Sequence, residues 1–229
     1  MPSTREIKQR IGSIRNIGQI TKAMQMVATS KMRRAQERVQ QARPYADQLR
    51  GMVSRLARAG GADIGSGAAL MAERPVRKIG YVLITPDGGM CGALPSNINR
   101  RAANSVQDVQ RELAEKGGPT PEVDIVAVGR KGRDFVVRSP YNLLAEFTNY
   151  GARPGLNDAA AIAQVAVDAF IKGEVDVVYL VYAKFVNTVT QVPTVVKLLP
   201  VEPPTDEGDE KKNVEYIYEP DPQSLFESL

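Results

Sequence analysis

The sequence predicts an α/β protein: a long N-terminal helix that can form a coiled coil, then a Rossmann-like α/β domain with a mostly parallel sheet and an antiparallel edge hairpin. Three observations predict this. Apolar residues recur at heptad spacing through the first 58 residues. Buried-type strands then alternate with amphipathic helices, which favours a parallel sheet covered on both faces. Two strand-like segments finally meet near residue 188 with no room for a helix between them.

The first element is a shaft-like helix over residues 1–58. Ser3 or Thr4 can cap it, with Glu6 in the first turn. Heptad steps mark the a and d positions of one coiled-coil seam. The seam residues are Ile7, Ile14, Thr21, Ala28, Ala35, Ala42, Leu49 and Leu56, with Ile11, Gly18, Gln25, Met32, Val39, Ala46 and Val53. A second apolar stripe, displaced from the seam, holds Ile17, Ile20, Met24 and Val27.

Pro44 falls inside this helix and should kink it, because proline removes one backbone hydrogen bond. The heptad register continues past Pro44, so the sequence favours one bent helix over two separate ones. At 1.5 Å per residue, about 55 residues extend roughly 80 Å. This length exceeds the diameter of a small domain, and most of the helix is therefore expected to project.

A Gly-rich flexible linker is expected over residues 59–75, an α/β domain over 76–203 and a polar tail over 204–229. Within the α/β domain, strands are predicted at 78–85, 123–129, 142–148, 175–186 and 189–201, and helices at 96–117, 129–137 and 157–173. Only Asn187 and Thr188 separate the last two strands, which predicts a hairpin. Pro193 fits an edge strand.

The net charge of +4 conceals an asymmetry between the helix and the remainder. Residues 1–60 hold 13 Lys and Arg against 3 Asp and Glu, so +10, which leaves 4 − 10 = −6 for the rest. Seven cations between residues 7 and 36 are predicted to lack an acidic neighbour on the helix. An acidic protein partner explains this pattern better than nucleic acid, because Tyr45 is the only aromatic residue there for base stacking.

Composition excludes several classes of chemistry. One cysteine cannot form an internal disulfide or a cysteine-built metal cluster, and no histidine is present as a base or metal ligand. No apolar run approaches the length of a membrane span. Residues 1–15 superficially resemble an Arg-rich transit peptide, but the same helical pattern continues far beyond them.

Two turns are weaker candidates for chemistry. Residues 85–93, TPDGGMCGA, follow a strand and precede a helix, where phosphate can bind. They match neither common phosphate-loop motif, so a tight turn that needs glycine dihedrals is favoured. Cys91 in this turn could act as a nucleophile, but no histidine can serve as its base. Residues 129–134, GRKGRD, could bind an anion, although a solvated turn and helix start is preferred.

Several stretches closely resemble the gamma subunit of the rotary F-type ATP synthase. They are IKQRIGSIRNIGQITKAMQMVATSKMRRAQ followed by RPYA, then ITPDGGMCGALPSNIN, GRKGRDF, VYLVYAKFVNTVTQ and YEPDPQSL. They occur in family order across essentially the whole chain. The resemblance implies that the long helix is half of a central shaft inside a ring of alternating alpha and beta subunits. The α/β domain would be a foot on the membrane c ring and the epsilon subunit.

The resemblance also implies particular contacts. The residues expected at the acidic beta-subunit lever loops and catch region are Lys22, Met24, Lys31, Arg33 and Arg34. Those expected at the polar loops of the c ring are Tyr216, Tyr218 and Glu219. The chain itself would be non-catalytic and bind no cofactor or metal, while ATP, ADP and magnesium would bind to alpha and beta subunits.

A peripheral location on the cytoplasmic face of a bacterial inner membrane is expected from the resemblance, with no membrane insertion and no nucleic acid. Two departures stand out. Gly88 occupies a position where many members have Arg. The family also continues into a second long helix, whereas this sequence stops at Leu229, so an apparent lack of the C-terminal shaft helix is expected. The alternatives are a nucleic-acid-binding protein using the basic helix, and a small-molecule α/β enzyme using the Cys91 turn.

Overall fold

The structure is a computed structural model that describes residues 3–59, 69–151 and 154–201. It divides into two compact units, Met1–Arg55 and Leu56–Leu229. The first is almost entirely helix, and the second holds the sheet. Within the described part of the chain, no helix combines the length and apolarity needed to cross a membrane.

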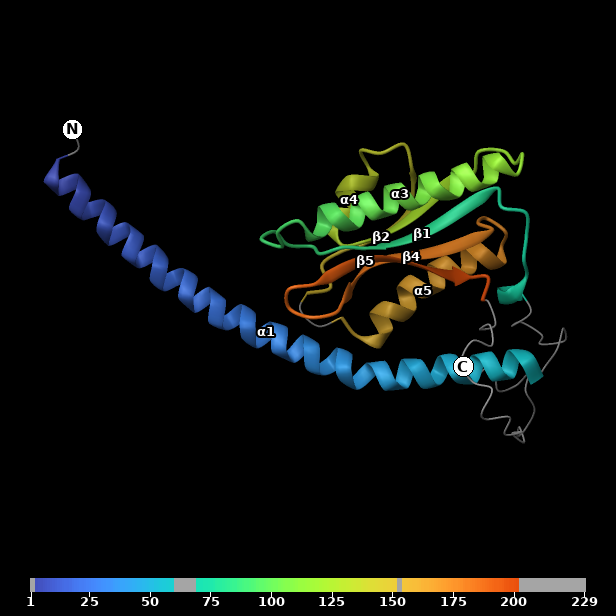
Figure 1. The fold of residues 1–229 in the computed structure, drawn as a ribbon, viewed down its shortest axis with the longest axis horizontal. Helices are drawn as coiled ribbons and strands as arrows, with labels where there is room; N and C mark the ends of the chain where they lie inside the picture. The colour runs from blue at the N-terminus through green and yellow to red at the C-terminus, as the bar shows by residue number, and fades with distance from the viewer. Residues whose placement is uncertain (1–2, 60–68, 152–153, 202–229) are drawn as a thin grey trace. The chain divides into compact units, whose positions relative to one another are not determined.

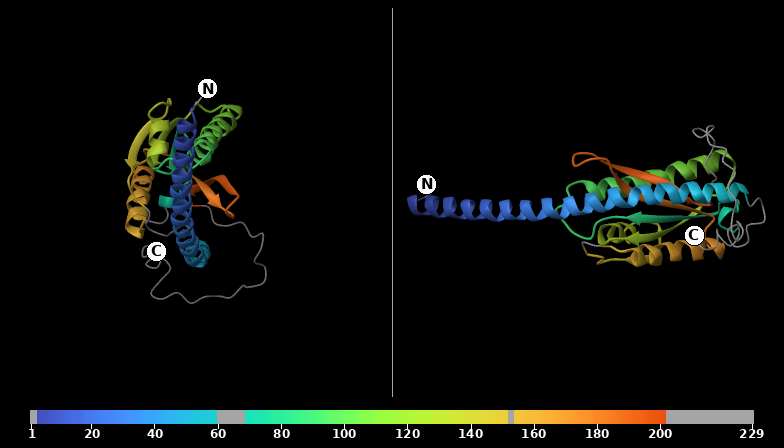
Figure 2. Two further views of the ribbon diagram at one scale, coloured as in Figure 1. Left: turned by 90° about the vertical axis from the view of Figure 1, so that its left-hand side faces the viewer. Right: turned by 90° about the horizontal axis from the view of Figure 1, so that it is seen from below.

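Helix α1 (Thr4–Ala59) is a single helix of 56 residues that continues through Pro44, and Figure 2 shows it unbroken. The bend is visible in Figure 1, so the prediction of one bent helix is confirmed. Its N-terminus is capped as expected. The Glu6 backbone N–H donates to Ser3 Oγ at 3.3 Å, and the Ser3 N–H donates to Glu6 Oε2 at 3.0 Å.

The second unit is built on a five-stranded sheet in the order β3-β2-β1-β4-β5. The strands are β1 (Lys78–Ile84), β2 (Glu122–Val128), β3 (Asn142–Phe147), β4 (Val177–Phe185) and β5 (Gln191–Leu199). Strands β1 to β4 are parallel to one another, and β5 pairs antiparallel with β4. The predicted mostly parallel sheet with an antiparallel edge is confirmed, and a register shift between Ile125 and Val126 interrupts the β2–β3 pairing.

Three helices cover the two faces of this sheet (Figure 1). They are α3 (Leu94–Glu115), α4 (Arg130–Val136) and α5 (Leu156–Ile171). One core cluster joins α3 and α4 to the sheet through residues such as Ile98, Val136 and Leu83. A second cluster packs α5 on the other face, with Phe170 fully buried. Burial on both faces explains why β1 and β2 are near-continuous apolar runs rather than alternating ones.

The edge hairpin differs from its prediction in the length of its loop. The strands end at Phe185 and restart at Gln191, so five residues connect them instead of two. Asn187 Oδ1 accepts the backbone N–H groups of Val189 and Thr190 at 2.9 and 2.8 Å. An asparagine that organises its own turn in this way shortens the strands on either side. Pro193 lies on the edge strand β5, as predicted.

Part of the segment predicted as a flexible linker contacts the α/β unit. Leu70 packs against the α5 cluster, and its carbonyl accepts the N–H of Val201 at 2.9 Å. Arg74 Nη1 donates to the Phe170 carbonyl at 2.9 Å, and its guanidinium lies 5.1 Å from the centroid of the Phe170 ring. Leu70 and Arg74 therefore tie this part of the segment to the α/β unit, while residues 60–68 lie outside the described residues.

We expect the free energy of unfolding to fall between pH 10 and about 12 because of Tyr81. Its side chain is buried, and burial raises its pKa to about 12 from the ordinary value near 10. Above pH 10 the unfolded chain loses the proton while the folded chain keeps it. The loss is about 2 to 3 kcal/mol over this window.

Urea titrations of the wild type and Tyr81→Phe at pH 8 and pH 11 would measure this effect. The phenylalanine ring keeps the stacking on Tyr179, whose centroid lies 5.3 Å away, but cannot ionise. A stability difference between the two proteins that does not change from pH 8 to pH 11 would contradict the assignment to Tyr81.

Candidate functional site on the long helix

Helix α1 presents side chains that would normally be covered. Every side chain from Ser3 to Ala35 is exposed. Large apolar residues are among them, including Ile14 at 69% exposure and Ile11 at 60%. Helices in water depend mainly on packing of an apolar face for their stability, and extended exposed apolar surface marks contact with other chains. The surface of α1 is therefore the first candidate functional site.

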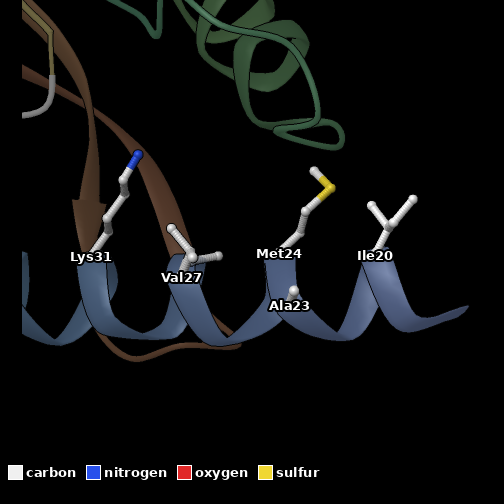
Figure 3. A pocket seen from close by; sticks show the side chains of 6 residues that line it. Ile20, Ala23, Met24, Val27 and Lys31 are labelled. Carbon is white, nitrogen blue, oxygen red and sulfur yellow. The ribbon is translucent and has the colours of Figure 1, made fainter. Parts of the chain in front are cut away.

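The predicted second apolar stripe forms one face of α1 (Figure 3). Ile20, Met24 and Val27 are spaced at i, i+4 and i+7, so helical geometry places them on the same side. They are 60%, 49% and 56% exposed. The side chain of Lys31 extends this face by one turn, and Ala23 and Ala28 line it as well. An apolar strip thus ends in a cation.

The predicted partner-binding residues all lie exposed on α1, but on more than one side of it. Met24 and Lys31 are two turns apart and share the face of Figure 3. Lys22 and Arg33 are three turns apart on a different side, and Arg34 projects between the two groups. This distribution suits a helix that is contacted around its circumference rather than along a single stripe.

Like charges lie close together on this helix. Arg34 and Arg38 are spaced at i and i+4, and Lys31 precedes Arg34 by three residues. All three side chains are exposed. Like charges at such spacings destabilise an isolated helix by a few tenths of a kcal/mol per pair. A negatively charged partner would remove this repulsion.

One expectation about these cations was wrong. Arg33 does have an acidic neighbour on the helix, because its Nε donates to Glu37 Oε1 at 3.0 Å. Glu37 lies just beyond the stretch of residues 7–36 that suggested a helix without acidic neighbours. Both side chains are more than half exposed, so the pair contributes only about 0.3 to 0.5 kcal/mol and can exchange partners.

The expected c-ring residues Tyr216, Tyr218 and Glu219 lie outside the described residues. Gly88, which replaces the arginine of many family members, is exposed, and a side chain there would meet no atom within 4 Å. Its φ angle is not positive either. The backbone at Gly88 is therefore compatible with an arginine, so glycine is not required by the local conformation.

The second candidate, the turn at residues 85–93, proves to be a cap for α4. The N-cap residue Gly129 has no side chain to cap the helix. Three successive residues of the turn instead accept the first N–H groups of α4: Asp87 Oδ1 from Arg130 at 2.9 Å, the Pro86 carbonyl from Lys131 at 3.3 Å, and Thr85 Oγ1 from Gly132 at 2.7 Å. These N–H groups of α4 are therefore occupied. The phosphate hypothesis concerned the start of α3, the helix that follows the turn, and the α4 bonds do not bear on it.

Sequence analysis did not identify Thr85, Asp87 or Asn149 as important residues. The Asn149 N–H donates to Asp87 Oδ2 at 3.0 Å, and Arg130 Nη2 donates to Asn149 Oδ1 at 3.0 Å. A Thr-Pro-Asp sequence directly after a buried strand was the available signal, because Thr and Asp favour turns and caps. The residues that bond to Thr85 and Asp87 lie 43 to 62 positions further along the sequence. No local sequence pattern reveals such contacts.

Cys91 faces a surface pocket of about 360 Å³ between its own turn, α3 and α4. Its thiol donates to the carbonyl oxygens of Gly89 and Gly88 at 3.3 and 3.7 Å. The carboxylate in the pocket belongs to Asp134, whose pKa is lowered by the hydrogen bond from Arg133 at 2.9 Å. Lowering the pKa makes this carboxylate a weaker base. Lys131 and Arg138 also line the pocket.

The backbone of this turn differs in detail from its prediction. Positive φ angles occur at Gly92, as expected for glycine, and at the non-glycine residue Met90, both at 57°. Gly88 and Gly89 do not adopt such angles. The expected need for glycine dihedrals is thus confirmed at Gly92 alone. The side chain of Met90 is 92% exposed.

Comparison with known proteins finds relatives that match the whole chain, from the long helix through the sheet. The gamma chain of the ATP synthase of Roseiflexus castenholzii is 43% identical over 231 residues, covering all of this chain and 76% of that protein. The gamma chain of Pelotomaculum thermopropionicum is 42% identical with the same coverage. A family described as ATP synthase matches residues 3–229. The chain belongs to the ATP synthase gamma-chain family.

A solved structure of the same family shares the fold. The match is a chain in the central stalk and c ring of the mitochondrial ATP synthase of Tetrahymena thermophila, at a TM-score of 0.58 and 25% identity. The alignment covers 91% of this chain and 84% of that chain. The gamma-chain family accounts for both units, the long helix and the α/β sheet, and the resemblance seen in the sequence is confirmed.

Proposed function

We propose that this chain is the central-stalk rotor subunit of an F-type ATP synthase. Proton-driven rotation of a c ring would turn the α/β unit, and α1 would transmit the rotation to the catalytic sites of beta subunits for ATP synthesis or hydrolysis. The observation that carries the proposal is the surface of α1, where apolar and cationic residues are exposed around the helix. Membership of the gamma-chain family supports it.

The mechanism we propose is mechanical rather than chemical. Each angle of an asymmetric shaft would interact differently with the open and closed states of each catalytic site, and only such a difference can shift their populations. The chain would be non-catalytic and bind no cofactor, with ATP, ADP and magnesium on the alpha and beta subunits. Among the described residues, no cluster of three or more metal-ligating side chains is found.

The partners we propose are the alpha, beta and epsilon subunits and the c ring. Lys22, Met24, Lys31, Arg33 and Arg34 would meet the beta-subunit lever loops and catch region, and Tyr216, Tyr218 and Glu219 would meet the c ring. Placement of the first five on several sides of α1 supports a partner that surrounds the helix. The corresponding location is the periphery of a bacterial inner membrane, on its cytoplasmic face.

Co-purification tests this proposal directly. We expect tagged chain mixed with alpha and beta subunits to elute as one complex that hydrolyses ATP, while the chain alone hydrolyses none. Alpha and beta subunits without the chain are the control. The proposal fails if no complex forms although circular dichroism shows the chain to be helical. Tight, steeply salt-dependent binding to DNA or RNA would instead favour the nucleic-acid alternative.

A further inference from the structure

The ends of three neighbouring elements are joined by one carboxylate in the α/β unit. Asp87 follows β1, Arg130 begins α4 after β2, and Asn149 follows β3. Asp87 accepts the backbone N–H groups of Arg130 and Asn149 at 2.9 and 3.0 Å, one on each oxygen. Hydrogen bonds to an ionised acceptor are about twice as strong as neutral ones.

Two of these three residues are also linked directly. Arg130 Nη2 donates to Asn149 Oδ1 at 3.0 Å. Asn149 adopts a φ angle of 67°, in the left-handed region that is uncommon for residues with a side chain but that asparagine tolerates better than most. The bond from its N–H to Asp87 helps to hold that conformation. Asp87 therefore helps to hold two loops as well as its own.

Asp87 also anchors the turn that contains it. At Gly88, Gly89 and Gly92, an added Cβ atom would meet no other atom within 4 Å. Met90 in this turn is almost fully exposed. Thr85 and Pro86 bond to α4 as well, but of these three residues only Asp87 also bonds to the loop after β3.

We infer that Asp87 is a positioning residue, whose carboxylate joins the loops after β1, β2 and β3 into one rigid edge that the rotor needs for coupling. This inference rests on the proposed rotor function. Torque that crosses the α/β unit must pass through the connections between its elements. If this edge of the sheet deformed under torque, part of the rotation would go into that deformation and would not reach the catalytic sites.

Asp87→Asn is the direct test, because it keeps the shape but replaces one acceptor oxygen by an NH₂ group that faces an N–H donor. We expect hydrogen exchange at the Arg130 or Asn149 amide to accelerate by about tenfold or more, as loss of a charge-assisted hydrogen bond predicts. In the assembled complex we expect proton pumping per ATP hydrolysed to fall by roughly half. The same exchange rate as in the wild type at both amides would overturn the inference.

Asp176→Asn is the matched control. Asp176 Oδ2 accepts the backbone N–H groups of Arg77 and Lys78 at 2.7 and 2.9 Å, at the opposite edge of the sheet where β1 begins. Both substitutions remove the charge of a carboxylate that accepts two backbone N–H groups, but Asp176 accepts both on one oxygen and Asp87 accepts one on each. A merely structural role predicts that the two variants lower Tm and coupling in parallel. The inference requires that Asp87→Asn reduces coupling clearly more at equal loss of Tm, and equal reductions would overturn it.

A second variant keeps the test decisive if Asp87→Asn does not fold. Arg130→Ala removes the side-chain bond to Asn149 but keeps the backbone N–H that Asp87 accepts. Arg130 is exposed, so the fold should tolerate the change, and we expect a smaller loss of coupling in the same direction. Normal coupling in this variant would count against the inference. If the wild-type chain does not assemble with alpha and beta subunits, the rotor proposal is refuted instead. Hydrogen exchange at the Arg130 and Asn149 amides would still show whether Asp87 holds these two loops.

Discussion

Reversing the charge of Lys22, Lys31 and Arg34 together is expected to reduce ATP-driven proton pumping in the assembled complex by about tenfold or more. Each exposed cation is expected to contribute 0.2 to 1 kcal/mol to the contact with an acidic partner, and replacing attraction by repulsion roughly doubles the change. Three such changes sum to roughly 1 to 6 kcal/mol. Arg33 is left out because its Nε is bonded to Glu37, and reversing it would also disturb the helix.

The measurement is the ratio of proton pumping to ATP hydrolysis, with circular dichroism of the isolated variant as a check on α1. A control variant with Lys8, Arg38 and Arg43 reversed carries the same net charge on the same exposed helix. The residue assignment predicts a much smaller effect for the control. Equal losses in both variants would show that total charge matters and these positions do not.

Gly129→Ala is expected to lower the stability of the α/β unit by about 3 kcal/mol or more, the range of severe single substitutions. Gly129 has a φ angle of 92°, which strains any residue with a Cβ atom. An added Cβ would also lie 1.9 Å from the Thr85 carbonyl oxygen and 2.9 Å from Thr85 Oγ1. Relief of the clash would pull Thr85 away from the first turn of α4.

Thermal unfolding followed by circular dichroism measures this effect, with an expected fall in Tm of roughly 6 to 12 °C for a unit of this size. Gly92→Ala separates the two causes. Gly92 also has a positive φ angle of 57°, but an alanine there would meet no atom within 4 Å, so only about 1 kcal/mol of backbone strain is expected. If Gly129→Ala is no worse than Gly92→Ala, the close approach to Thr85 is unimportant.

Elements with strong periodicity were predicted well because their signals are local. The capping pair Ser3 and Glu6 and the uninterrupted α1 follow from residues within a few positions of one another. The five strands follow from short apolar runs between turns. The hairpin loop was predicted too short, because the hydrogen bonds of Asn187 to its own loop compete with strand pairing.

The candidate site on α1 could be predicted in composition but not in arrangement. Exposure of the cations follows from their charge. The Arg33–Glu37 pair was missed because the stretch considered ended at residue 36, although the i, i+4 spacing was visible in the sequence. The assignment of Lys22, Met24, Lys31, Arg33 and Arg34 to beta-subunit contacts stays a prediction, as does the assignment of Tyr216, Tyr218 and Glu219 to the c ring.

The sequence by itself determined the length of α1, its unpaired apolar and basic surface, and the order of strands and helices, since hydrophobic periodicity and caps depend on near neighbours. Only the tertiary structure decided what the turn after β1 does. Parallel strands place their carboxyl ends at one edge of the sheet, and this brings Asp87 within hydrogen-bonding distance of Arg130 and Asn149, far away in the chain. The turn after β1 therefore caps a helix that begins far away from it in the sequence.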